Sequence, residues 1–149
     1  MTKLFSKFLN DYDIISDYYN YLVKLTKNNH FVGSTNEWII DNYYMVAECK
    51  NYICKTFKDD KVLKRKIKKY SNIYYVLSDI FDKHSFNVDK GTLFRELNSY
   101  QNKNNKYFSY SEISVINIFV IMNVVDRLAS FSLLRKQKEE DIIKVEKLI

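Results

Sequence analysis

The chain has 149 residues, of which 46% are hydrophobic and 16% aromatic, and its formal net charge is +6. This length is typical of one compact domain, and the hydrophobic content excludes disordered proteins of low hydrophobicity and high charge. With no proline and two glycines, the residues that form tight hairpin turns are almost absent. We therefore predict an all-α fold over residues 1–149, a single-domain bundle of five or six helices with a long, largely apolar central helix.

The positive charge raises the question of an acidic partner, either nucleic acid or an anionic membrane surface. Only four of the 24 basic residues are arginine, which is the residue best suited to bidentate phosphate contacts. The joint abundance of Lys, Asn, Ile and Tyr is typical of AT-rich coding, which by itself raises the number of lysines. Composition therefore does not favour nucleic acid as a partner.

Cysteine usage and the termini limit the class of protein further. Cys49 and Cys54 would point about 140° apart on one helix, so they are poor disulfide partners for each other. Two histidines and no further cysteine cannot form a zinc motif. We expect two free thiols in a reducing compartment, no metal and no cofactor. Because residues 1–7 lack the apolar stretch of a signal peptide, we do not expect secretion.

Apolar residues at steps of three and four predict a first amphipathic helix over Leu4–Lys27. The polar segment Asn28–Gly33 is expected to end this helix in a loop. Ser34 followed by Glu37 matches a capping box, in which the two side chains bond to each other's backbone amides. A second helix is therefore expected from Ser34 to about Lys55.

A basic connector between Phe57 and Tyr70 is expected to be partly helical. Helical periodicity resumes over Ile73–His84. Asp89 is expected to cap the next helix, which passes through Tyr100. Gly91 in its first turn costs about 1 kcal/mol relative to alanine, which makes this helix start the weakest of the set.

The polar residues 102–107 predict a loop, after which Ser109 and Glu112 repeat the capping-box pattern. We expect the longest helix to begin here and to continue to the last residue. Its apolar side chains cover most of the circumference, which is typical of a helix at the centre of a bundle. Asn117 and Asn123 would then be buried and would need Tyr hydroxyls or backbone carbonyls as partners.

Two further features of this last helix bear on the kind of protein. The apolar run Ile113–Val125 is about 13 residues long, shorter than the roughly 20 that cross a membrane, so we predict a buried helix. The helix reaches Ile149 without a residue that would stop it. This ending is typical of a fragment of a longer protein.

The second helix carries a grouping of acidic side chains that could form a catalytic or metal site. Glu37, Asp41 and Glu48 share one face, and paired carboxylates can transfer protons or hold a metal. A di-iron bundle would add Glu-x-x-His pairs, and none occurs. Nucleophile-elbow, phosphate-loop and dinucleotide motifs are also absent. We therefore favour a solvated face or inter-helix contacts, with a small carboxylate-site enzyme as an alternative.

Trp38 lies on a neighbouring stripe of the same helix, together with Met45, Cys49 and Tyr52. We expect Trp38 to be buried in the core, because a large apolar side chain gains most from leaving water.

The best candidate for a binding patch is the basic connector. Lysines meet phosphates, and the tyrosines that follow could stack on bases or lie among lipid headgroups. No helix-turn-helix, RNA-recognition or zinc-finger pattern accompanies it. We favour a solvated connector and keep an independent nucleic-acid- or anionic-membrane-binding protein as an alternative. Its basic residues are Lys61, Lys64, Arg65, Lys66, Lys68 and Lys69.

The segment Asn36–Glu48 resembles the E-W-L-L-D-N-F/Y-x-x-V/I-x-E motif near the N-terminus of bacterial cyclic β-1,2-glucan synthases and related glucan-processing enzymes. Further likeness follows in the same order over residues 6–135, at Ile73–Phe81, at Tyr100-Gln101 and at Ser111-Glu112. The chain departs from the family where a proline-containing L-P-x-x-Y-Y-x-x-L-P segment is replaced by the basic connector, and where Gly, Trp and Pro around Glu112 are replaced.

In that family this region precedes a membrane-embedded glucosyltransferase module that uses UDP-glucose. The resemblance implies a non-catalytic accessory or interaction domain, on the cytoplasmic side at the inner face of the membrane, with the other domains of a parent enzyme as partners. No catalytic residue is carried over to this chain. The matching positions are expected to hold the helices together, and they are Trp38, Asp41, Asn42, Glu48, Tyr100, Gln101 and Glu112.

Overall fold

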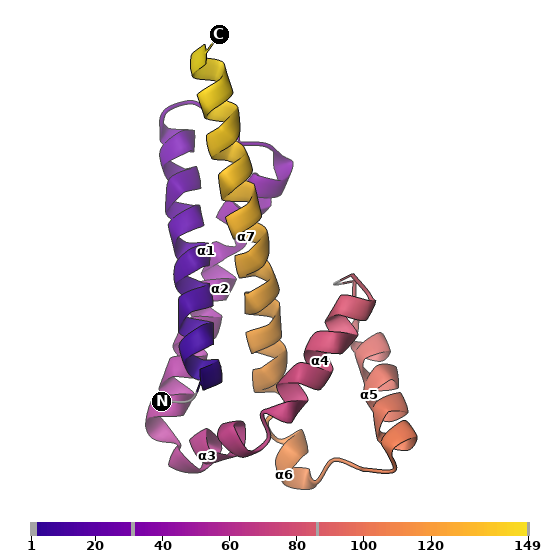
Figure 1. The fold of residues 1–149 in the computed structure, drawn as a ribbon. Coiled ribbons are helices and arrows are strands. Elements are labelled where there is room, and N and C mark those ends of the chain that lie inside the picture. The colour runs from indigo at the N-terminus through magenta and orange to yellow at the C-terminus, as the bar shows by residue number, and fades with distance from the viewer. Residues whose placement is uncertain (1–2, 31, 86, 149) are drawn as a thin grey trace. The chain divides into compact units, whose positions relative to one another are not determined.

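The computed structural model describes residues 3–30, 32–85 and 87–148 (Figure 1). Over these ranges the chain is helical and contains no strand, so the predicted all-α fold is confirmed. Six helices have two turns or more, and α6 is a single turn. The helices are α1 (Lys3–Lys27), α2 (Ser34–Asp59), α3 (Lys61–Lys69), α4 (Asn72–Lys83), α5 (Lys90–Asn104), α6 (Tyr110–Ile113) and α7 (Ile116–Leu148).

The helices group into two compact units. Unit 1 contains Lys3–Lys55 and Val125–Ile149, and unit 2 contains Thr56–Val124. The long helix α7 therefore begins in unit 2 and continues in unit 1. The single domain expected over residues 1–149 stays a prediction, and each unit is described by itself.

Unit 1 is built from α1, most of α2 and the later part of α7. Its core joins Tyr18 and Leu22 of α1 to Val32 and Ile39, with Phe131 of α7 packed against them. These positions follow the three- and four-residue steps that predicted an amphipathic α1.

A buried polar cluster links the three helices of unit 1. Asn36 is fully buried, and its Nδ2 donates to the carbonyl of Val32 at 2.7 Å and to the Glu139 carboxylate at 3.3 Å. The Tyr18 hydroxyl donates to Oδ1 of Asn36 at 2.6 Å. Because each polar atom of this amide has a partner, burying it costs little and fixes how the helices align.

Unit 2 packs α3, α4, α5, α6 and the start of α7 around a second core. Its fully buried side chains include Ile67, Ile73, Leu77 and Phe119. Asn123 is buried as predicted, and its Nδ2 donates to the carbonyls of Tyr74 (3.2 Å) and Phe119 (3.0 Å).

Asn117 is exposed, so its predicted burial is wrong. It lines an open groove on the surface of unit 2.

Local capping signals are confirmed at two helix starts. Asp89 accepts a hydrogen bond from the Thr92 amide at 2.7 Å. Ser109 and Glu112 form the predicted capping box, with bonds of 3.2 and 3.1 Å. These side chains bind backbone amides that have no partner inside the helix. Capping motifs can therefore be recognised in the sequence.

The first of the two predicted capping boxes does not set the start of α2. This helix begins at Ser34, and the Glu37 amide donates to the carbonyl of Gly33 at 3.0 Å. Gly33 has a φ of 81°, a left-handed conformation that favours glycine.

The basic connector is also more helical than expected, because Asp60 caps α3 by accepting from the Leu63 amide at 2.9 Å.

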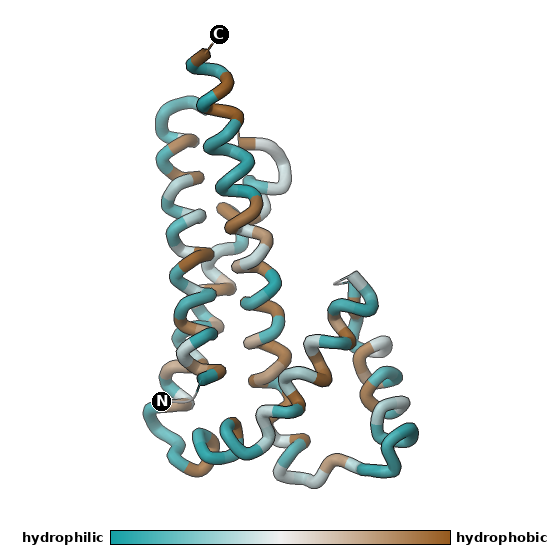
Figure 2. Tube along the Cα trace, viewed as in Figure 1, coloured by the Kyte–Doolittle hydropathy of each residue, from teal (hydrophilic) through white to brown (hydrophobic). Residues whose placement is uncertain are grey.

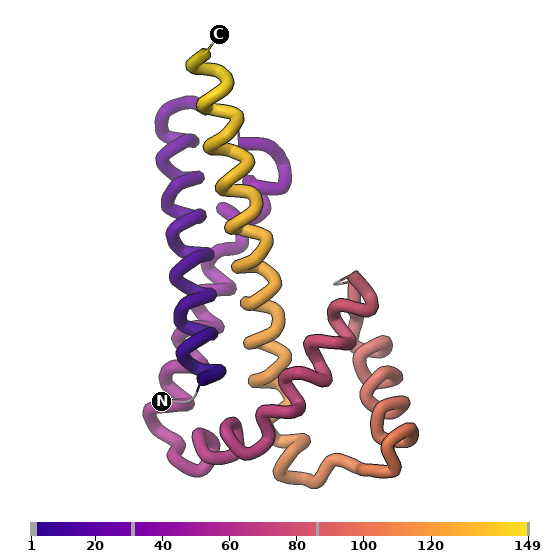
Figure 3. Tube along the Cα trace, viewed as in Figure 1, coloured from indigo at the N-terminus to yellow at the C-terminus, as the bar shows by residue number. Residues whose placement is uncertain are grey.

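The helix predicted from Ser109 onward is interrupted after one turn. The Ser114 hydroxyl donates to the Ser111 carbonyl at 2.6 Å, and the Val115 amide donates to Glu112 three residues back. Such local bonds compete with the regular ladder of an α-helix. Figure 3 shows the chain passing from α5 through a loop into the short α6 and then into α7.

The stretch Tyr110–Leu148 is long and apolar enough to cross a membrane by length and composition, and 39% of its most apolar 18 residues are buried. The sequence-based expectation that no segment is long enough to cross a membrane considered only the apolar run Ile113–Val125, which is shorter than this stretch. Core helices of proteins outside membranes meet the same criterion. The first part of α7 is a core helix of unit 2, because it buries Ile118, Phe119 and Met122.

Candidate binding surfaces

Trp38 is 54% exposed, so its predicted place in the core is wrong. The buried face of α2 instead includes Asn36, Ile39 and Ile53. Trp38 is one residue before Ile39, hence about 100° around the helix from it. Large apolar side chains occur on several faces of α2, so periodicity alone could not identify the one that packs.

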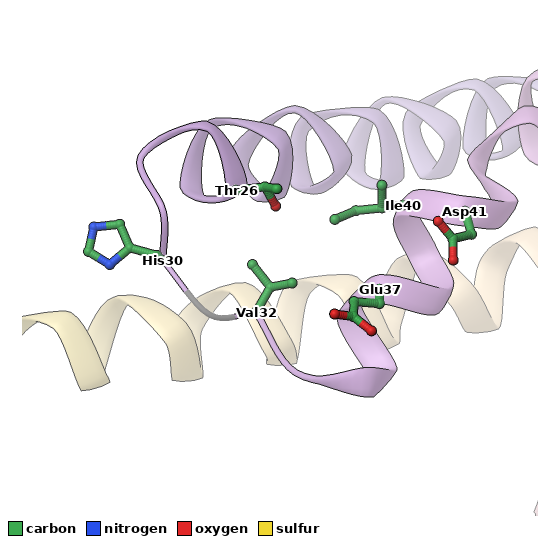
Figure 4. A pocket seen from close by; sticks show the side chains of 6 residues that line it. All are labelled: Thr26, His30, Val32, Glu37, Ile40 and Asp41. Atoms are coloured by element: carbon green, nitrogen blue, oxygen red, sulfur yellow. The ribbon is translucent and has the colours of Figure 1, made fainter.

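The predicted acidic grouping on α2, Glu37, Asp41 and Glu48, is exposed, as the solvated-face interpretation predicts. Glu37 and Asp41 border a shallow pocket of about 320 Å³, which Thr26, His30, Val32 and Ile40 also line. In Figure 4 the imidazole of His30 lies away from both carboxylates. Among the described residues there is no group of three or more His, Cys, Asp or Glu side chains that could hold a metal.

The remaining positions of the glucan-synthase-like motif have local roles. Asn42 donates to the Trp38 carbonyl within α2 at 2.8 Å. The Tyr100 ring stacks on Phe108 with centroids 6.0 Å apart, and the Gln101 side chain accepts from the Phe108 amide at 2.8 Å.

The expected task of holding helices together fits only part of this set. Tyr100, Gln101 and the capping residue Glu112 fasten the loop between α5 and α6. Trp38, Asp41 and Glu48 are exposed, so this role is wrong for those three. An exposed side chain has too few neighbours to fix the packing of a helix.

The two cysteines are free and partly buried. Burial raises the pKa of the Cys49 thiol, and the neighbouring charge of Glu48 raises it further. Cys49 therefore lacks the lowered pKa of a reactive thiol.

Helix α3 forms a dense cationic surface, which we name the α3 patch and define as Lys61, Lys64, Arg65, Lys66, Lys68 and Lys69. Ile67 is fully buried on the opposite side of the helix, and Lys66 alone of the six is partly buried. Over the described part of the chain no ion pair joins these cations to an acidic side chain. Figure 2 shows α3 as mostly hydrophilic.

We predict that binding of anionic vesicles or nucleic acid to the α3 patch is weak and falls steeply with salt, because exposed lysines act through counterion release. The triple variant Lys64→Glu, Arg65→Glu, Lys68→Glu should abolish this binding in a vesicle co-sedimentation assay. A triple reversal of exposed lysines on α1 and α7, at Lys3, Lys24 and Lys144, serves as the charge-matched control. Unchanged vesicle and nucleic-acid binding by the α3 variant would contradict the prediction.

Unit 2 also contains an apolar groove that sequence analysis did not identify. We name it the α5–α7 groove; its volume is about 600 Å³. Phe94 and Ile113 in its walls are each more than half exposed. The groove is lined by Lys90, Leu93, Phe94, Leu97, Asn98, Gln101, Phe108, Ile113, Ile116, Asn117, Val120 and Ile121.

The apolar stripes that form the groove could be recognised in the sequence, but their periodicity predicted that they lie in the core. What it could not show is that Ser114 and Val115 break the helix, so that α6 and the start of α7 form a wall facing α5. A groove of this volume with few polar groups is typical of a binding site.

The described residues thus offer three surfaces: the acidic and aromatic side of α2, the α3 patch and the α5–α7 groove. In the comparisons with known proteins, no family model, curated protein or solved structure matches the chain.

Proposed function

We propose that the chain is a non-catalytic helical interaction module whose α5–α7 groove binds one amphipathic helix of a partner domain. The observation that carries this proposal is the groove itself, an open, predominantly apolar site of about 600 Å³ on the surface of unit 2. Apolar grooves of this kind bind helices that present one apolar stripe. Leaving the groove uncovered keeps several large side chains in contact with water.

The two walls of the groove match the length of a short helix. On α5 the lining residues run from Lys90 to Gln101 at steps of three and four, which corresponds to about 16 Å. On the other wall they run from Ile113 to Ile121. A partner helix of about three turns would span this distance.

The charge of the groove lining limits which partner helices fit the groove. Among the lining residues Lys90 is the one that carries a charge, and its ammonium group lies 5.8 Å from the centre of the Phe94 ring. Asn98 and Gln101 add polar groups along α5. The occupant should therefore carry apolar side chains along one stripe and a carboxylate at the end that reaches Lys90.

A pair of helical peptides tests this proposal. Both carry the same apolar stripe, and one has Glu, the other Lys, at the position that would meet Lys90. We expect calorimetry to show tighter binding of the Glu peptide, and Val120→Glu to abolish it by placing a charge in the groove. The matched control is Val145→Glu, an exposed valine on α7 in unit 1. Equal binding of the two peptides, or binding that survives Val120→Glu, would refute the proposal.

The partner domain itself is proposed from the resemblance to glucan-synthase-like enzymes. In that proposal the partner helix belongs to another domain of a carbohydrate-active parent enzyme, and the module lies on the cytoplasmic side at the inner face of the membrane. The order of the resembling segments over residues 6–135 supports it. Finding a glucosyltransferase in the same open reading frame would support the proposal, and an unrelated full-length protein would refute it.

A further inference from the structure

The exposed side of α2 concentrates large apolar side chains that stay open to solvent over about half of their surface. We name it the α2 face and define it as Trp38, Tyr44, Met45 and Tyr52, together with Glu37, Asp41 and Glu48. The four large side chains are each 40–59% exposed. Single exposed apolar residues are ordinary, but Trp, Tyr and Met gathered on one helix face are typical of protein interfaces. The failed prediction for Trp38 therefore points to a contact outside its own unit.

The α2 face is acidic within a basic chain. In the ranges that the structure describes, none of its three carboxylates takes part in an ion pair. They extend from Glu37 to Glu48, which corresponds to about 16 Å along the helix. A partner for this face should thus be basic, of similar length and able to cover aromatic rings.

We infer that the α2 face of one copy of this chain binds the α3 patch of a second copy. The α3 patch has cations without an ion pair over about 12 Å of helix, close to the extent of the acidic run. Val62, which is 53% exposed on the same helix, adds an apolar side chain for the rings of α2. This inference goes beyond the proposed function and does not involve the α5–α7 groove.

The two kinds of side chain would contribute differently to this contact. Exposed ion pairs add little affinity, since water and salt screen them, but they select the partner and its orientation. Trp and Tyr supply most of the binding energy when their rings are covered. We therefore expect self-association that weakens with salt and that covers Trp38.

Sedimentation equilibrium combined with tryptophan fluorescence tests the inference in the whole chain. Trp38 is the single tryptophan, so its emission reports this face alone. We expect the average mass to rise with protein concentration and the emission to shift to shorter wavelength in parallel. Both changes should be lost in Asp41→Lys/Glu48→Lys and also in Lys64→Glu/Lys68→Glu.

Mixing these two double variants in equal amounts should restore association, because each supplies the surface that the other lacks. Asp13→Lys/Asp17→Lys makes the same charge change on exposed α1 positions and should associate like the wild type. A wild type that stays monomeric at millimolar concentration would overturn the inference. So would association that survives either reversal, a mixture that fails to associate, or a wild type whose Trp38 emission responds to anionic vesicles but not to its own concentration.

Discussion

Replacing Phe119 by alanine should lower the free energy of unfolding by about 3–5 kcal/mol, because removing a buried aromatic ring loses its burial and leaves a cavity. The Phe119 side chain is fully buried in unit 2. Such a loss is a large share of the 5–15 kcal/mol that is typical of small domains. Chemical denaturation followed by circular dichroism measures it directly.

Trp38→Ala is the informative control for this experiment. Although tryptophan is the larger side chain, more than half of it is exposed, so we expect a cost of about 1 kcal/mol or less. A midpoint shift as large as that of Phe119→Ala would show that Trp38 is in the core after all. It would also remove the α2 face as a free surface.

Asn36→Ala should cost about 2–4 kcal/mol, even though it removes only a small polar side chain. The substitution leaves the Val32 carbonyl and the Tyr18 hydroxyl without their partner in a buried place. Burial also raises the pKa of Tyr18, so its hydroxyl stays protonated and keeps its need for an acceptor. Thermal unfolding of the variant beside the wild type measures the loss.

A double-mutant cycle separates this polar effect from lost packing. Tyr18→Phe removes the hydroxyl that donates a hydrogen bond to Asn36. Asn36→Ala should therefore lower the free energy of unfolding less in that background than in the wild type. The matched exposed position is Asn51, where the same change to alanine should be nearly neutral. Equal costs of Asn36→Ala in both backgrounds would mean that the hydrogen bond contributes nothing.

Features that depend on neighbouring residues in the chain could be predicted from the sequence. The caps at Asp89 and Ser109 are confirmed because they satisfy backbone amides only three residues away. The buried amide of Asn123 was also predicted, together with a carbonyl as its partner. An apolar stripe predicts that a helix packs, and that much follows from periodicity.

Features that depend on which face is covered could not be predicted. On α2, apolar side chains surround the helix, and the buried amide of Asn36 rather than the size of Trp38 marks the packed side. Near α7, hydrogen bonds of Ser114 and Val115 interrupt the helix. The uncovered groove beside Asn117 results from that interruption and from the path of α5, neither of which leaves a periodic signal.

The most direct test of the interaction-module proposal is a methyl NMR titration of the chain with the Glu-bearing amphipathic peptide. Isoleucine and valine methyl groups report both units, and the groove contains Ile113, Ile116, Val120 and Ile121. The proposal predicts saturable shifts confined to these methyl groups, while Ile15 and Ile39 in the core of unit 1 stay unchanged. Shifts that leave the groove untouched, or an absence of shifts at saturating peptide, would contradict it.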